Sequence, residues 1–218
     1  MNDAHRLAVL SEVKRNKVFA ILRGVQSNDI ESVVQALVDG GIRILEVTFE
    51  HGGSMNNTLA CVKEIVEKFN SEVICGVGTV TSIEQTRAAK SVGAQFVVSP
   101  NTDPTIIKLT RSLGMVSIPG AVTPTEAVKA SNAGADYVKL FPVAVFGIEY
   151  FKAISEVLKS IPFIVVGGVN VDNAKDFLDA GAVGIGIGSY LVNDKKLANE
   201  SLSHITMRAK KLVKLIQK

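Results

Sequence analysis

The chain has 218 residues, of which 47% are hydrophobic and 21% are charged, and its formal net charge is +3. This balance is normal for a well-packed globular protein. No apolar stretch is long enough for a transmembrane helix, and the basic run near the C-terminus is better explained by an exposed helix face than by a nucleic-acid patch. We therefore expect neither a membrane nor a nucleic acid as a partner.

Eight short runs rich in β-branched residues recur along the chain, and several are apolar throughout. Such runs are typical of strands that are covered on both faces in a parallel sheet. In chain order, the predicted strands are Val18–Leu22, Ile44–Thr48, Val73–Val77, Phe96–Ser99, Met115–Ile118, Tyr137–Leu140, Phe163–Val166 and Gly184–Ile187.

Segments with the apolar spacing of amphipathic helices alternate with these strands. They are Asp29–Asp39, Thr58–Phe69, Ser82–Ser91, Thr105–Leu113, Thr125–Asn132, Glu149–Leu158 and Asn173–Ala180. Two further helices are predicted at the ends of the chain, over Leu7–Asn16 and Leu197–Lys214.

Eight strand–helix units in a chain of this length predict an α/β protein with a (β/α)8 TIM barrel and an extra N-terminal helix. A doubly wound open sheet is the alternative, but it would normally show a composition break or a switch point, and we find neither. No linker or low-complexity segment divides the chain. We therefore expect a single domain over residues 1–218.

Cysteine and histidine usage gives no sign of a metal site. Cys61 and Cys75 lie in apolar sequence, and the histidines at 5, 51 and 204 are dispersed. Residues 1–6 lack the apolar core of a signal peptide. We expect a cytoplasmic protein whose cysteines are small core residues, without a metal site.

Lys139 is the most informative residue of the chain. It lies between Val138 and Leu140 in an apolar run that ends at Pro142. Lysine is almost never buried without a partner or a function, and burial lowers its pKa, which favours a neutral amine able to attack a carbonyl. This chemistry is that of Schiff-base enzymes. The alternative is an edge-strand lysine with its stem buried and its ammonium group in water.

Glu46 is a second ionisable residue inside a predicted strand, between Leu45 and Val47. We expect it to meet Lys139 inside the barrel. An acid beside such an amine is suited to move the protons that imine chemistry requires. The alternative is a buried ion pair with a structural role.

Glycines follow the last two predicted strands, at Gly167-Gly168 and at Gly188-Ser189. In TIM barrels, the loops after strands seven and eight frequently bind phosphate through backbone N–H groups. We therefore predict a phosphate site there, although glycines in these places could also serve tight turns.

Taken in order, these segments resemble the class I aldolases for 2-keto-3-deoxy-6-phosphogluconate (KDPG) and its 6-phosphogalactonate relative (KDPGal), which include 4-hydroxy-2-oxoglutarate (KHG) aldolases. The resemblance runs from about residue 18 to residue 191. It rests on eight short motifs: Ala20-Ile-Leu-Arg-Gly24, Leu45-Glu-Val-Thr48, Gly76-Val-Gly-Thr79, Ser99-Pro-Asn101, Pro119-Gly120, Val138-Lys-Leu-Phe-Pro142, Val166-Gly-Gly-Val169 and Gly188-Ser189.

The resemblance implies cleavage of a 2-keto-3-deoxy-6-phospho sugar acid into pyruvate and D-glyceraldehyde 3-phosphate, and it suggests cleavage of KHG as well. It implies a homotrimer that needs no cofactor and acts on a small-molecule substrate. The implied roles are Schiff-base formation for Lys139, acid–base catalysis for Glu46, carboxylate binding for Thr79, pocket shaping for Pro100 and Phe141, and phosphate binding for Gly167, Gly168, Gly188 and Ser189.

One segment departs from the family pattern. Many members of the phosphogluconate type carry Leu-Arg-Thr after Glu-Val-Thr, whereas this chain has Phe49-Glu50-His51. We expect Arg23 to replace the missing substrate-binding arginine, as in the phosphogalactonate-like branch. Two other functions stay open at this point: a phosphate-binding barrel isomerase or synthase that forms no imine, and a non-catalytic sensor of sugar phosphates.

Overall fold

The computed structural model describes residues 3–50, 53–193, 197 and 201–216. Its strands are β1 (Val18–Leu22), β2 (Ile44–Thr48), β3 (Ile74–Gly78), β4 (Phe96–Val98), β5 (Val116–Ile118), β6 (Gly120–Ala121), β7 (Val138–Leu140), β8 (Phe163–Val166) and β9 (Gly184–Ile187). Its helices are α1 (Asp3–Asn16), α2 (Ser27–Asp39), α3 (Asn56–Phe69), α4 (Ile83–Ser91), α5 (Pro104–Ser112), α6 (Pro124–Asn132), α7 (Val143–Val157), α8 (Ala174–Asp179) and α10 (Leu202–Ile216).

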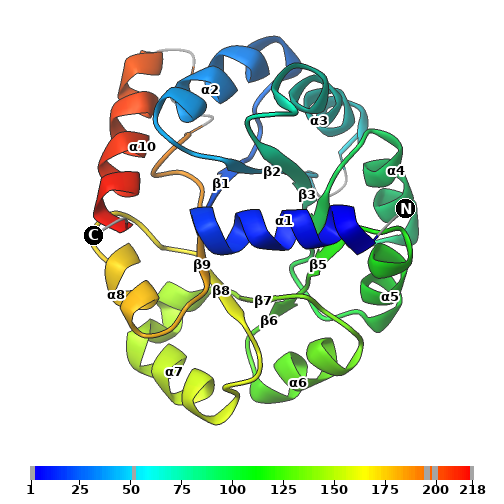
Figure 1. Ribbon diagram of the computed structural model, residues 1–218, viewed down its shortest axis with the longest axis vertical. Helices are drawn as coiled ribbons and strands as arrows, with labels where there is room; N and C mark the ends of the chain where they lie inside the picture. Colours follow the sequence, from blue (N-terminus) through cyan, green and yellow to red (C-terminus); the bar gives the residue numbers. More distant parts are fainter. Residues whose placement is uncertain (1–2, 51–52, 194–196, 198–200, 217–218) are drawn as a thin grey trace.

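The strands form one parallel sheet in the order β5-β4-β3-β2-β1-β9-β8-β7-β6, and the helices surround it (Figure 1). The fifth strand position is divided at Pro119, which has no N–H to donate. The predicted strand, Met115–Ile118, is observed as β5 and pairs with β4, whereas β6, which was not predicted, lies beyond the proline and pairs with β7. The Lys139 N–H also donates to the Pro119 carbonyl, at 2.8 Å. The divided strand thus closes the predicted (β/α)8 barrel.

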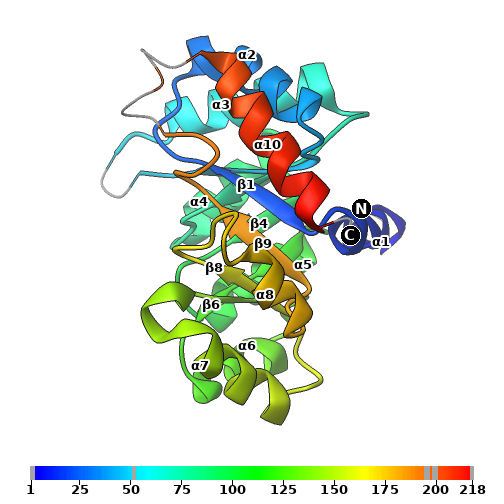
Figure 2. The ribbon, with the colours of Figure 1, turned by 90° about the vertical axis from the view of Figure 1, so that its left-hand side faces the viewer.

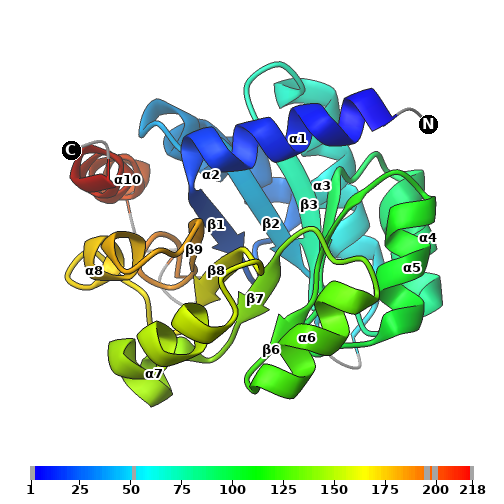
Figure 3. The same ribbon diagram turned by 60° about the horizontal axis from the view of Figure 1, so that its bottom comes forward.

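Helix α1 lies across the end of the barrel at which the strands begin (Figure 3). Val9 and Val13 of this helix are buried against the barrel interior. The Tyr137 hydroxyl donates to the Leu10 carbonyl at 3.3 Å, and Arg6 forms an ion pair with Asp136. These contacts close the N-terminal end of the barrel, so the opposite end remains for a functional site.

Strand alternation separates two layers of apolar side chains. One layer lies between the strands and the outer helices. The other fills the barrel, and it includes Ile44 from β2 and Tyr137, which directly precedes β7. Glu46 and Lys139 each follow one of these inward residues by two positions, so they point inward too. This register places both ionisable side chains nearer the open end of the barrel.

Three helices begin four or more residues away from their predicted starts, and the first is α1, which begins at Asp3 rather than Leu7. Helix α7 begins at Val143 and is interrupted at Gly147, where φ is 80° and ψ is 174°. The predicted start at Glu149 therefore missed a segment directly after β7. Helix α10 begins at Leu202 and packs along α2 (Figure 2), whereas the prediction began at Leu197 and included residues 198–200, which lie outside the described residues. None of the described helices is both long and apolar enough to cross a membrane.

Candidate active site

Glu46 and Lys139 are both buried inside the barrel, with 3% and 7% of their surfaces exposed. They come from β2 and β7, and the charge of each shifts the pKa of the other. No ion pair within 4.0 Å joins them in the part of the chain that the structure describes. The two groups are therefore neighbours inside the barrel that do not form a closed salt bridge.

Burial dominates the protonation of Glu46. It raises the pKa of this carboxyl group, and the charges of Lys139 and Arg23 oppose the rise. Removal of a carboxylate from water disfavours its charged form. The protonated form of Glu46 consequently persists to higher pH than in a solvated glutamate, which suits a group that must donate a proton.

Burial also dominates the protonation of Lys139, in the opposite direction. It lowers the pKa of the amine, the charge of Glu46 opposes this effect, and the charge of Arg23 adds to it. The neutral amine, which is the nucleophilic form, is therefore more abundant near neutral pH than in a solvated lysine.

Arg23 directly follows β1, and its side chain is exposed at the open end of the barrel. Among the described residues, its guanidinium group has no hydrogen-bond or ion-pair partner, and Glu50 is also exposed and unpaired. Its charge nevertheless lowers the pKa of both Glu46 and Lys139. The predicted carboxylate-binding arginine thus lies within electrostatic reach of both. His51 lies outside the described residues.

Thr79 and Phe141 directly follow strands β3 and β7, Pro100 follows β4 after Ser99, and all three are partly buried. Thr79 has a φ of 58°, which is rare for a β-branched residue, and such strain clusters at functional sites. The Pro100 carbonyl oxygen lies 2.3 Å from the position of an added Cβ on Gly120, so these strand ends are closely packed. The Phe141 ring centroid lies 4.8 Å from Nζ of Lys139.

The predicted phosphate-binding residues lie in the loops after β8 and β9, which are neighbours in the sheet. Gly167 and Gly168 have φ values of 92° and 79°, a conformation that favours glycine. After β9, the N–H groups of Leu191 and Val192 donate to the Gly188 carbonyl at 2.9 and 3.1 Å.

The turn after Gly188 has two backbone N–H groups that could donate hydrogen bonds to a ligand. Among the described residues, the N–H groups of Ser189 and Tyr190 donate to no protein acceptor. Unpaired N–H groups at the start of a helical turn are suited to bind an anion. In the loop after β8, the side-chain amide of Asn173 donates to the Gly168 carbonyl at 3.1 Å and thereby stabilises this loop.

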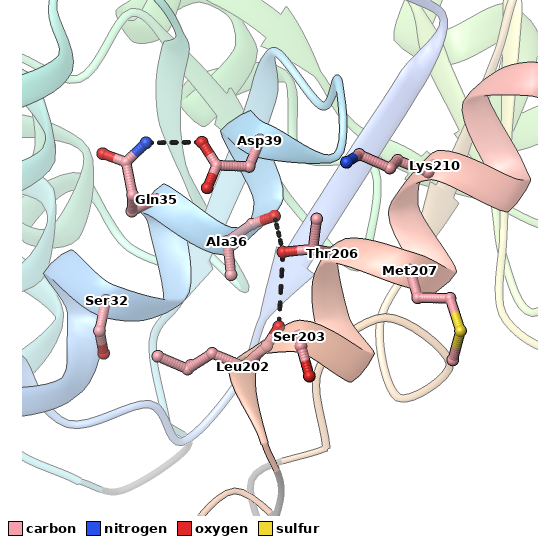
Figure 4. A pocket seen from close by; sticks show the side chains of 9 residues that line it. All are labelled: Ser32, Gln35, Ala36, Asp39, Leu202, Ser203, Thr206, Met207 and Lys210. Carbon is pink, nitrogen blue, oxygen red and sulfur yellow. Dashed lines mark hydrogen bonds between the residues drawn. The ribbon is translucent and has the colours of Figure 1, made fainter.

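A separate groove of about 680 Å³ lies on the outside of the barrel, between α2 and α10 (Figure 4). Thr206 of α10 lines this groove, and its hydroxyl group donates to the Ala36 carbonyl of α2 at 2.9 Å. Leu202 and Met207 line it without any of the predicted site residues. The groove is therefore distinct from the site at the strand ends.

Comparison with known proteins identifies the family. Residues 9–208 match the family model described as KDPG and KHG aldolase. The chain belongs to this aldolase family. The 2-dehydro-3-deoxy-6-phosphogalactonate aldolase of Escherichia coli strain K12 is 34% identical to this aldolase over 90% of the chain and 93% of that protein. Enzymes of this kind are lyases, and the chain is an aldolase of the same family.

Solved structures agree with this assignment. A structure described as native KDPGal superposes with a TM-score of 0.83 and 33% identity, over 92% of this aldolase and 94% of the other chain. A second, KDPG aldolase from Legionella pneumophila with pyruvate captured as a covalent carbinolamine intermediate, has a TM-score of 0.82 and 27% identity, over 90% and 94%.

Sequence reasoning missed two contacts of the site. One is the close approach of Gly78 to the Glu46 carboxyl group, and the other is the position of the Phe141 ring beside the Lys139 amine. The contact between Gly78 and Glu46 could have been found in the sequence, because glycines at 76 and 78 occupy inward-facing positions on the strand next to Glu46. The second depends on a side-chain torsion, which no spacing pattern reveals.

Proposed function

We propose that this aldolase is a Schiff-base enzyme that cleaves a 2-keto-3-deoxy-6-phospho sugar acid into pyruvate and D-glyceraldehyde 3-phosphate. The observation that carries the proposal is the burial of one amine, Lys139, and one carboxyl group, Glu46, within electrostatic reach of each other inside the barrel. Perturbed ionisable groups of opposite sign in a cavity are characteristic of acid–base and nucleophilic chemistry.

The reaction begins with attack of the neutral Lys139 amine on the C2 ketone of the substrate. Protonated Glu46 delivers a proton to the carbinolamine oxygen, which leaves as water and yields an iminium ion. The lowered pKa of Lys139 and the raised pKa of Glu46 favour the two protonation states that this step needs.

Cleavage follows from the electron demand of the iminium ion. The C3–C4 bond breaks, and its electron pair forms the C2=C3 double bond of an enamine while the nitrogen regains its lone pair. The C4 hydroxyl group loses its proton to Glu46, directly or through water, and becomes the aldehyde of glyceraldehyde 3-phosphate. Protonation of the enamine at C3 and hydrolysis of the imine then release pyruvate and regenerate Lys139.

In this proposal, different groups around the Lys139 amine bind the carboxylate, the reacting carbons and the phosphate of the substrate. Arg23 and Thr79 bind the carboxylate of the 2-keto acid, and Pro100 and Phe141 enclose the reacting carbons. Gly167, Gly168, Gly188 and Ser189 bind the phosphate. A guanidinium group meets a carboxylate through two parallel hydrogen bonds, and backbone N–H groups suit a phosphate.

We further propose the galactonate epimer, KDPGal, as the preferred substrate. The identity to the aldolase named for phosphogalactonate is 34%, against 31% for the KHG/KDPG aldolase of the same organism. Arg23 also occupies the position expected in the phosphogalactonate-like branch, while Glu50 stands where many phosphogluconate-type members have an arginine. KHG cleavage to pyruvate and glyoxylate is a weaker, secondary activity in this proposal.

Release of pyruvate tests the proposal. Purified protein is given KDPGal, KDPG and KHG in turn, and pyruvate is measured by its reduction to lactate. We expect the highest kcat/KM for KDPGal, and no release by Lys139→Met, which has an unbranched side chain one atom shorter and no amine. Binding without cleavage would favour a sensor, and rearrangement without pyruvate would favour an isomerase. The predicted homotrimer, single domain and cytoplasmic location stay predictions.

A further inference from the structure

The Phe141 ring lies beside the amine that is proposed to form the Schiff base. Its centroid is 4.8 Å from Nζ of Lys139. The two residues are two positions apart, at the end of β7, so their side chains leave the backbone on the same side. A cation within about 6 Å of a ring face is attracted by the negative charge density of the ring. The distance satisfies this condition.

The ring is held in place by its packing. A Cβ added to Gly167 would lie 3.0 Å from Cδ2 of Phe141 and 3.0 Å from Cα of Pro142, so the glycine backbone packs closely behind the ring. The Phe141 N–H donates to the Ala121 carbonyl at 3.1 Å, and the Ala144 N–H donates to the Gly167 carbonyl at 3.0 Å. The ring therefore has little room to move away from Lys139 toward the β8 loop.

We propose that Phe141 is a catalytic residue whose ring face stabilises positive charge on the Lys139 nitrogen, both in the ammonium group and in the iminium intermediate. This inference rests on the proposed function, because only a Schiff-base mechanism forms an iminium ion there during turnover. It assigns the aromatic ring an electrostatic role in addition to its shape.

The surroundings of Lys139 explain why a ring is useful there. The charged groups that act on its nitrogen are Glu46 from β2, which favours the cation, and Arg23 after β1, which disfavours it. Glu46 loses its negative charge whenever it holds a proton, and burial favours that form. The attraction of a ring is unaffected by proton transfer. It therefore acts on the cation throughout the interval between loss of water and cleavage of the C3–C4 bond.

A series of fluorinated phenylalanines at position 141 tests the proposal. Each fluorine withdraws electron density from the ring face while the size of the ring changes little. The pKa of Lys139 is read without substrate, from the pH dependence of its carbamylation by cyanate, followed by peptide mass spectrometry. Because the ring favours the cation, its loss lowers the pKa. We expect a graded decrease of about one pKa unit from phenylalanine to the trifluorinated residue.

Phe141→Leu, which has no ring, should show the same lowered pKa as the trifluorinated protein. The same fluorinated residues at Phe151, which is buried in the outer layer against Phe163 and Phe177, serve as the matched control and should leave the pKa unchanged. A second readout is the amount of pyruvate that borohydride traps on Lys139, which should decrease in the same order.

The outcomes separate this inference from the proposed function. If the unmodified protein traps no pyruvate on Lys139, the Schiff-base function itself fails. If it traps pyruvate but the pKa of Lys139 is the same across the series and in Phe141→Leu, the function stands and the electrostatic role of Phe141 is wrong.

Discussion

Oε1 of Glu46 lies 1.9 Å from the position that a Cβ would occupy on Gly78. The two residues belong to neighbouring strands, β2 and β3, which pair in parallel. A side chain of any size at position 78 would therefore occupy the space of the Glu46 carboxyl group. Glycine at this position is explained by the acid that it accommodates.

Two alanine substitutions on β3 should have different effects. In Gly78→Ala the three atoms nearest to the new methyl group all belong to the flexible side chain of Glu46, so we expect a folded protein with strongly reduced turnover. In Gly76→Ala it would lie 2.4 Å from the Phe96 ring and 2.5 Å from the Phe96 carbonyl oxygen. Overpacking of this kind typically costs about 1–3 kcal/mol of stability. Thermal unfolding and pyruvate release distinguish the variants, and equal loss of stability in both would contradict this account.

Glu46→Gln should fold normally and lose most of its activity. The amide keeps the shape of the side chain but cannot donate and accept the proton. General acid–base groups typically contribute ~10²–10⁴-fold to the rate. Exchange of the pyruvate methyl protons with deuterated water, followed by NMR, measures this step. Glu84→Gln, which changes an exposed carboxylate on α4, is the control and should exchange at the wild-type rate. Normal exchange by Glu46→Gln would assign proton transfer to another group.

Ser189→Asp should weaken binding of the phosphorylated substrate. The new carboxylate lies beside the N–H groups that are proposed to bind phosphate, so we expect KM for the phospho sugar acid to increase at least tenfold, about 1.4 kcal/mol, while pyruvate proton exchange is unchanged. Ser189→Asn has a similar size without the charge and should show a much smaller increase. An equal effect of both variants would point to shape rather than charge.

Gly168→Asp is a less suitable test of the same loop. A Cβ there would lie 2.3 Å from Cβ of Ala144, and the φ of 79° is strained for any other residue. Loss of activity in that variant would mix misfolding with charge repulsion. The exposed position of Ser189 avoids this problem.

Replacement of Arg23 should change both affinity and pH dependence. Arg23→Ala removes a charged hydrogen-bond donor, so we expect pyruvate to bind about tenfold more weakly. This loss is near the lower end of the range for hydrogen bonds to charged groups, because the arginine is exposed to solvent. Its positive charge lowers the pKa of Lys139, so its removal raises that pKa. Less neutral amine is then present at a given pH, and the acidic limb of the rate profile should move to higher pH.

Arg23→Lys separates the two effects of the arginine. Lysine keeps the charge, so the acidic limb should stay in place, but it cannot form two parallel hydrogen bonds to a carboxylate, so the affinity for pyruvate should still decrease. If Arg23→Ala leaves both the affinity and the pH profile unchanged, the arginine has no role in the site.

The barrel could be predicted largely because its strands are short, apolar and separated by helical patterns. β1, β2, β8 and β9 have the predicted bounds, and the remaining strands differ by one or two residues at their ends. The division of the fifth strand at Pro119 was not predicted. It depends on which neighbour each half pairs with, and that is decided by closure of the whole ring rather than by local sequence.

The site was predictable where an ionisable residue interrupts an apolar strand. Lys139 and Glu46 stand out for this reason, and the alternation of side chains correctly predicts that both point inward. The left-handed conformation of Thr79 was not predicted, because threonine rarely adopts it. Nor was the start of α7 at Val143, since the segment up to Gly147 has no polar face that marks a helix.

Covalent trapping of pyruvate tests the central claim most directly. The protein is incubated with pyruvate and borohydride, which reduces an imine to a stable secondary amine, and the modified peptide is identified by mass spectrometry. The account predicts one adduct, on Lys139, with loss of activity in proportion to its formation and no adduct in Lys139→Met. An adduct on a different lysine, or full activity after treatment, would contradict it.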